Sequence, residues 1–257
     1  MSNSMPNVLV LTIDKIDFEN VVKNMKNDWN YQCEYQVNEE KKLTSYVFEY
    51  SNLTFVCSEF NSRFPDDLHS EIIESRYGEN MENIYNRHQS FWIVSIAECT
   101  ETDLRIVYMM FTRVIMSIIS GNKECIIYDT RSKVAVESYV YLSMYNNMKI
   151  CWEQNKTFFP TDFYVNICIE EINGINSGYT IGFEIFNDYE IVIDEEDISA
   201  NELRIIMKYI IGNVISRQDK IGNGDTFPIP LNGQYEDAIS KRFKCEKLSK
   251  DALAIVF

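Results

Sequence analysis

The chain has 257 residues, with 24 lysines and arginines against 39 aspartates and glutamates, giving a formal charge of −15 and a pI near 4.6. Nucleic acids are bound through lysine and arginine, which displace counterions from the phosphates, so we do not expect this acidic chain to bind them. With 46% hydrophobic and 13% aromatic residues, the composition predicts a folded globular protein and excludes a disordered one.

No apolar run reaches the ~18–20 residues needed to cross a bilayer. The longest, residues 106–119, is interrupted by Thr112, Arg113 and Ser117. The first residues contain neither the basic nor the apolar segment of a secretion signal. The seven cysteines are scattered and form no Cys-x-x-Cys pair, which is typical of reduced thiols. We therefore expect a cytoplasmic protein with no membrane partner.

The chain opens with a pattern that predicts β-α-β-β. Residues 8–13 are an apolar run of strand length, and apolar residues at helical spacing follow over residues 18–29. Two β-rich runs, 44–50 and 53–60, meet at Ser51-Asn52, a dipeptide that suits a hairpin turn.

A central β-α-β unit follows a polar helical connector over residues 65–85. Thr100 to Asp103 fit a capping box, which predicts the start of the helix of this unit. The parts of the unit are a strand over residues 91–97, a helix whose buried face includes Leu104, Phe111 and Ile118, and a strand over residues 125–128. A shorter helix is expected over residues 136–147.

After Pro160 the pattern changes to strands. Asn173-Gly174 and Ser177-Gly178 are turn signals. They predict an antiparallel meander over residues 163–171, 179–186 and 190–193. Ser199 and Glu202 form a second capping box that opens a helix, and short strands are expected near residues 227, 239–243 and 252–257.

These elements predict an α+β or mixed α/β fold, in which a mixed parallel and antiparallel sheet is covered by four to five helices. The expected domains are an N-terminal β-α-β-β subdomain with its helical connector, residues 1–86, and a C-terminal mixed α/β domain, residues 87–257. One compact domain overall is the alternative.

Four segments resemble the bacterial family known as domain of unknown function 4261. They are residues 86–95, residues 181–193, Gly224-Asp225-Thr226 and the C-terminal residues 254–257. The resemblance covers the chain from roughly residue 85 to the end, and the opening pattern is similar to the N-terminal part of the family. It implies the fold of that family and a bacterial cytoplasmic setting, without implying a reaction.

The polar positions that match this family are candidates for a site. Its arginine–histidine pair corresponds to Arg87 and His88, its glutamate to Glu190 and its aspartate to Asp225. These four residues support one hypothesis, an enzyme or small-ligand-binding protein. A lone histidine beside an arginine completes no catalytic set, however, and His88 also suits a structural role at the start of a strand. Neither histidines nor cysteines have the spacing of metal ligands, so the sequence predicts no metal and no cofactor.

The acidic charge favours another hypothesis, a non-catalytic protein that binds a basic protein partner, as bacterial immunity proteins bind toxins. Complementary charge speeds association and sharpens the choice of partner. The candidate contact residues are the acidic clusters Glu39, Glu40, Asp66, Asp67, Asp194, Glu195, Glu196 and Asp197. The last four also precede a predicted helix, where the helix dipole stabilises negative charge, so a purely structural role is the competing interpretation.

Overall fold

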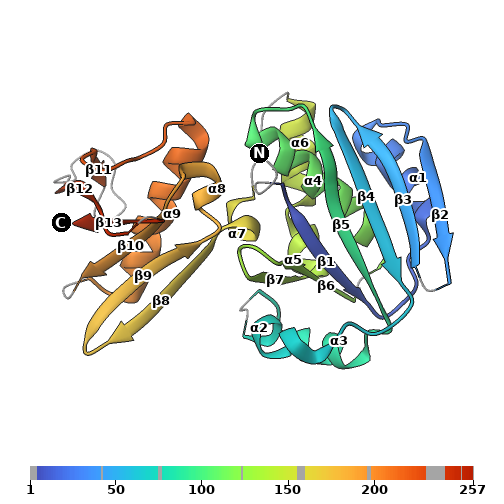
Figure 1. Ribbon diagram of the computed structural model, residues 1–257, viewed down its shortest axis with the longest axis horizontal. Coiled ribbons are helices and arrows are strands. Elements are labelled where there is room, and N and C mark those ends of the chain that lie inside the picture. Colours follow the sequence, from blue (N-terminus) through green and yellow to red (C-terminus); the bar gives the residue numbers. More distant parts are fainter. Residues whose placement is uncertain are drawn as a thin grey trace. The chain divides into compact units, whose positions relative to one another are not determined.

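A computed structural model describes residues 5–41, 43–74, 77–122, 124–154, 160–195, 198–229, 241–249 and 251–256. The chain forms two compact units, Met1–Phe163 and Tyr164–Phe257 (Figure 1). Each unit contains one sheet with helices packed on it. The fold is therefore a mixed α+β fold, rich in sheet.

The first unit is built on a seven-stranded sheet with the order β2-β3-β4-β5-β1-β6-β7. All neighbouring strands in it are antiparallel. Its strands are β1 (Asn7–Thr12), β2 (Tyr35–Glu40), β3 (Leu43–Tyr50), β4 (Leu53–Phe60), β5 (Ser90–Cys99), β6 (Cys125–Asp129) and β7 (Val134–Glu137). The predicted hairpin at Ser51-Asn52 is confirmed, since it joins β3 to β4 and Ser51 has a positive φ of 56°.

The helical elements of this unit are α1 (Phe18–Trp29), the 3-10 turn η1 (Asp66–Leu68), α2 (His69–Ile73), α3 (Met81–Arg87), α4 (Leu104–Ile119), α5 (Ser138–Ser143), α6 (Tyr145–Glu153) and α7 (Thr161–Tyr164), the last ending in the second unit. Helices α1 and α4 pack against each other on one face of the sheet (Figure 1). On the other face, α2 and α3 cover a cluster of buried residues that includes Leu9, Leu11 and Phe91.

In the sheet, β1 lies between the two strands of the predicted β-α-β unit. Strands β5 and β6 both pair antiparallel with β1, which lies between them, so β5 and β6 run parallel without touching. Of the three residues expected on the buried face of the helix, Phe111 and Ile118 are buried and Leu104 is half-buried. The capping box expected at Thr100 is wrong, because the helix is capped by Asp103, whose side chain accepts the N–H of Arg105.

The boundary expected at residues 86/87 lies inside the first unit. Strand β5, which follows it, pairs with both β1 and β4, so a division there would cut through one sheet. The chain divides instead between Phe163 and Tyr164. The helix expected over residues 136–147 also differs, since its first residue belongs to β7 and the helix is split into α5 and α6.

Strand β2 has no counterpart in the predicted elements. Five of its six residues are exposed, so it lacks the apolar alternation by which strands are found in a sequence. Among the strands that the structure describes, it pairs with β3 alone and forms one edge of the sheet.

The second unit contains a six-stranded mixed sheet with the order β11-β12-β13-β10-β9-β8, in which β10 and β13 are parallel. Its strands are β8 (Asn166–Ile172), β9 (Ile175–Ile181), β10 (Glu190–Glu195), β11 (Thr226–Ile229), β12 (Lys241–Lys247) and β13 (Ala252–Val256), and its own helices are α8 (Glu184–Asn187) and α9 (Ala200–Arg217). The sequence predicts four to five helices. Among the described residues, four helices have nine residues or more, α1, α4, α6 and α9, and the other helices are shorter.

Strands β8, β9 and β10 pair antiparallel in that order, as in a meander. The middle strand differs from the expected 179–186, because β9 ends at Ile181 and Glu184–Asn187 form α8. Asn173 and Gly174 both have positive φ, 55° and 84°, as a two-residue hairpin turn requires. The turn expected at Ser177-Gly178 is wrong, because these residues lie within β9. A Cβ on Gly178 would lie 2.7 Å from Sδ of Met207, so the glycine lets α9 approach the sheet closely.

The capping box of α9 offers a test of the fold. Oγ of Ser199 accepts the N–H of Glu202 at 3.3 Å, and Oε2 of Glu202 accepts the N–H of Ser199 at 3.1 Å. We expect Ser199→Ala to lower the free energy of unfolding of the second unit by about 1 kcal/mol, measured in urea. Ser216→Ala, at the other end of α9, is the matched control and should change it by less than half as much. Equal effects of the two substitutions would contradict a specific role for the cap.

Candidate functional site

Arg87 and His88, at the end of α3, are held by local contacts. Nη1 of Arg87 lies 3.1 Å from Oε1 of Glu124, and both side chains are about half exposed. His88 is buried; its Nε2 accepts the N–H of Phe64 at 2.9 Å, and its Nδ1 donates to the carbonyl of Tyr85. One donor and one acceptor fit a neutral imidazole in a fixed tautomer. His88 thus links the segment before η1 to the end of α3, as its structural interpretation requires.

Glu190 binds the turn that follows β9. Its Oε1 accepts the N–H of Gly182 at 2.6 Å, and its Oε2 accepts the hydroxyl of Thr180 at 2.6 Å and the N–H of Phe183 at 3.2 Å. Burial, followed by a hydrogen bond with the carboxyl of Glu184, raises the pKa of Glu190 to about 8. Oε2 of Glu184 is itself buried without a donor among the described residues. A proton on Glu190 is the donor that this oxygen lacks.

Asp225 closes a turn at the surface of the second unit. Its Oδ2 accepts the N–H of Gly222 at 2.8 Å, and its backbone carbonyl accepts the N–H of Cys245 at 2.8 Å. Arg87 and His88 therefore belong to the first unit, and Glu190 and Asp225 to the second. Each of the four takes part in local hydrogen bonds that explain its polar character.

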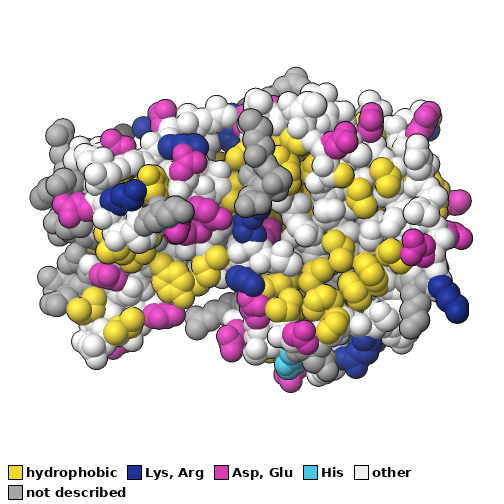
Figure 2. All heavy atoms as spheres, in the orientation of Figure 1, with side chains coloured by type: hydrophobic (Ala, Val, Ile, Leu, Met, Phe, Trp, Pro, Cys, Tyr) yellow, Lys and Arg dark blue, Asp and Glu magenta, His cyan; other side chains and the backbone are white. Residues whose placement is uncertain are grey.

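Some residues of the acidic clusters are exposed, and others lie outside the described residues. Glu39 and Glu40 are exposed at the end of β2, Asp67 is exposed in η1, and Asp194 is exposed in β10. The side chains of Asp66 and Glu195, and the whole of Glu196 and Asp197, lie outside the described residues. Acidic side chains stand along the β2 side of the first unit (Figure 2).

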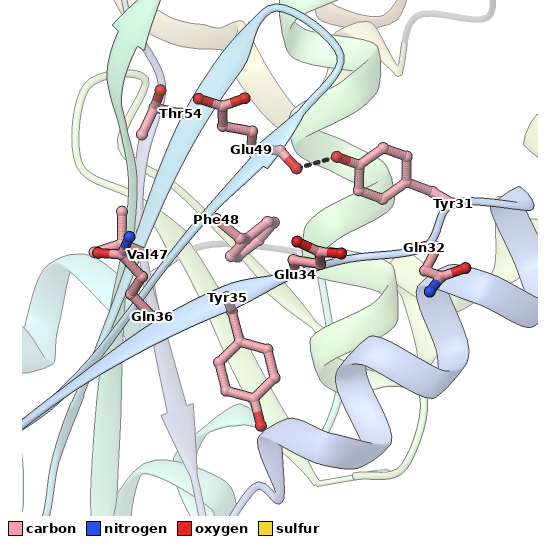
Figure 3. A pocket seen from close by; sticks show the side chains of 9 residues that line it. All are labelled: Tyr31, Gln32, Glu34, Tyr35, Gln36, Val47, Phe48, Glu49 and Thr54. Atoms are coloured by element: carbon pink, nitrogen blue, oxygen red, sulfur yellow. Dashed lines mark hydrogen bonds between the residues drawn. The ribbon is translucent and has the colours of Figure 1, made fainter.

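A groove of about 750 Å³ opens beside β2, where the loop after α1 passes β3 and the start of β4 (Figure 3). It is lined by Tyr31, Gln32, Glu34, Tyr35, Gln36, Val47, Phe48, Glu49 and Thr54. The lining residues include two glutamates, two glutamines and three aromatic residues, of which Phe48 is buried, and none of the nine is a lysine or an arginine. Its own chemistry therefore favours a cation.

Local structure holds the walls of this groove in place. Asn30 ends α1 in the left-handed conformation, with φ of 53°, and turns the chain toward β2. The ring of Tyr31 then packs 4.4 Å from that of Tyr50, and its hydroxyl donates to the carbonyl of Glu49 (Figure 3). Tyr35 packs edge to face on Phe18 of α1 at 5.0 Å. The exposed carboxylates Glu34 and Glu49 are thus mounted on fixed backbone.

The pKa of Tyr31 is raised by burial and by the negative charge of neighbouring groups. Burial, together with neighbours that include Glu49 and Glu34, raises the pKa of the Tyr31 hydroxyl above its usual value. The phenol stays protonated at neutral pH and keeps its role as a donor. Carboxylates beside aromatic faces are the groups that bind ammonium and guanidinium side chains.

Glu39 and Glu40 are candidate residues from the sequence, whereas Tyr31, Glu34, Tyr35 and Glu49 are not. The signal that the sequence offers for them is the run of interleaved tyrosines and glutamates over residues 31–36. Their convergence with Glu49 depends on the pairing of β2 with β3, and β2 is not among the predicted strands.

Among the described residues, no three or more histidine, cysteine, aspartate or glutamate side chains lie together as metal ligands would. The part of the chain that the structure describes also has no helix with the length and apolar character of a membrane span. Comparison with protein-family models, with curated proteins and with solved structures finds no match. The resemblance to domain of unknown function 4261 therefore stays a prediction.

Proposed function

We propose that this is a non-catalytic binding protein that takes a basic segment of a protein partner along the edge strand β2 and into the adjoining groove. The observation that carries the proposal is the lining of the groove, in which Glu34 and Glu49 accompany Tyr31 with no cationic residue among the nine. A lysine or arginine side chain would find both a counter-charge and an aromatic face there.

Strand β2 supplies the second part of the surface. It pairs with β3 on one side only, so alternate residues direct unpaired N–H and C=O groups outward, as in sheets that bind an extended peptide as an added strand. Its exposed Val37 and the carboxylates of Glu39 and Glu40 lie along the path of such a peptide. The overall charge of −15 would increase the rate of encounter with a basic partner.

The biological setting that we propose follows the resemblance noted above, an immunity-type or defence-related protein of the bacterial cytoplasm. The alternative, an enzyme or ligand-binding site at Arg87, His88, Glu190 and Asp225, has less support, because local hydrogen bonds already account for each of these side chains.

A synthetic peptide of alternating lysine and valine tests the proposal, with fluorescence anisotropy as the measurement. We expect Glu34→Lys combined with Glu49→Lys to weaken binding at least tenfold, because two attractions in the groove become repulsions. Glu39→Lys with Glu40→Lys should mainly slow association, and raising the salt above ~0.15 M should slow it as well.

The matched control is Asp67→Lys combined with Asp194→Lys, which changes the net charge equally but leaves β2 and the groove intact. It should weaken binding by less than threefold. Equal losses in the groove variant and the control would mean that only the net charge matters, and would overturn the proposed site. Salt-independent association would contradict the electrostatic part.

A further inference from the structure

Arg113 is the buried cation of the first unit for which the structure shows no counter-ion. It lies in the middle of α4, is 1% exposed, and has no carboxylate of the described residues within 4.0 Å of its guanidinium. A buried arginine is ordinarily paired, because removing its charge from water is costly. The chain has 39 carboxylates, yet none of those described is placed here.

The surroundings of Arg113 are aromatic and thioether groups. Its Cζ lies 4.1 Å from the centre of the Trp152 ring and 5.3 Å from that of Trp29. Nη1 contacts the hydroxyl of Tyr50 at 3.4 Å, and the two terminal nitrogens contact the sulfurs of Met109 and Met110. These groups solvate a cation only weakly. Nε is buried with no partner among the described residues.

Trp152, on α6, covers this cation from the outside. Its side chain is 37% exposed, whereas Trp29 is 1% exposed. Of the two rings that contact the guanidinium, Trp152 is thus the one that borders solvent. Beside the guanidinium, Met109 and Met110 are flexible side chains that can repack about a guest.

We propose that Arg113 anchors a binding site for a carboxylate with an apolar body, which enters when Trp152 swings aside. The free Nε–H and a neighbouring terminal N–H form the fork that binds a carboxylate through two parallel hydrogen bonds. The body of the ligand would lie against Trp29, Trp152 and the two methionines. A doubly charged phosphate fits less well, because the guanidinium of Arg113 supplies a single positive charge.

This site is separate from the groove of the proposed function, since Arg113 is not among the residues lining that groove. Tyr50 lies between them, bonded to Arg113 and packed on Tyr31. A purely structural arginine, held by its two tryptophans, would behave differently: replacement by an apolar residue of similar size would leave the protein folded and remove no binding.

The experiment uses the full chain at constant ionic strength, with benzoate and octanoate as probes, inorganic phosphate as the competing anion and benzyl alcohol as the neutral control. Tryptophan fluorescence reports directly, because two of the three tryptophans contact Arg113. We expect saturable changes with the two carboxylates at millimolar concentrations and none with benzyl alcohol. Thermal unfolding in the same solutions should shift upward with the carboxylates alone.

Arg113→Met should bind both carboxylates at least tenfold more weakly while it stays folded, as checked by circular dichroism. If that variant fails to fold, Arg113→Lys keeps the charge without the fork and should show the same loss. Trp152→Phe should bind with altered affinity, whereas Tyr139→Phe, on the exposed surface of α5, should not. The proposal is overturned if neither carboxylate binds, if phosphate alone binds, or if both Arg113 variants bind as the unaltered chain does.

Discussion

Phe111→Ala should lower the free energy of unfolding of the first unit by about 3–5 kcal/mol, because it removes a large buried ring and leaves a cavity. Phe111 is fully buried on the inner face of α4, and its ring stacks 6.1 Å from that of Phe55 on β4. The substitution therefore loosens the contact between the central helix and the sheet. Urea unfolding followed by tryptophan fluorescence measures the effect, since all three tryptophans, at 29, 92 and 152, belong to the first unit.

Tyr139→Ala is the control for that experiment. Tyr139 is an aromatic residue in α5 of the same unit, but its side chain is 52% exposed. Surface substitutions of this kind change stability by about 0.5 kcal/mol or less. A loss for Phe111→Ala no larger than that for Tyr139→Ala would show that α4 does not pack on the sheet as described.

Glu184→Gln should reduce the pH dependence of stability in the second unit between pH 5 and pH 9. In the folded chain, burial and the Glu184 carboxyl raise the pKa of Glu190 to about 8 from an ordinary value of 4.5. Between those two values the folded state holds a proton that the unfolded state has lost. Stability must therefore fall as the pH rises from about 4.5 through about 8, and each pKa unit corresponds to about 1.4 kcal/mol.

The amide of glutamine at position 184 would donate to the Glu190 carboxylate and replace the proton, so the loss at high pH should shrink, while the part caused by burial of Glu190 remains. Hydrogen exchange of the amides of α9 is the measurement, because the second unit contains no tryptophan. Glu190→Gln is the matched variant and should destabilise the unit at every pH. Its amide keeps one acceptor oxygen but replaces the other with a nitrogen that cannot accept, so either Gly182 or the pair Thr180 and Phe183 loses its acceptor.

An unchanged pH profile in Glu184→Gln would mean that the two carboxyl groups are not coupled. The surface variant Glu171→Gln, on the exposed end of β8, controls for the loss of one negative charge. It should leave the profile as it is in the unaltered chain.

The sequence by itself determined the elements whose signals are local. The hairpin at Ser51-Asn52, the turn at Asn173-Gly174 and the capping box at Ser199 are each decided by a few neighbouring residues, through left-handed backbone conformations or side-chain caps. The buried stripe through Phe111 and Ile118 follows from helical periodicity. Such interactions depend on chain neighbours, and the structure places them where the sequence predicts.

Only the tertiary structure decided how the strands are ordered and where the chain divides. Strand β1 lies between β5 and β6, although more than 70 residues separate it from either along the chain. That pairing joins the subdomain expected before residue 86 and the first part of the domain expected after it into one sheet. The sequence predicts a turn at Gly178, but close packing against Met207 is the reason for a glycine at this position.

The candidate sites show the same division. Charge and composition pointed to a basic partner, and Glu39 and Glu40 lie on the strand that borders the groove. The groove depends on Glu34 and Glu49 meeting where β2 pairs with β3. The aromatic contacts of Arg113 depend on Trp29 and Trp152 reaching it from two other helices. Composition counts charges and rings, whereas a site requires that they converge, and convergence is set by strand pairing and helix packing between residues distant in the chain.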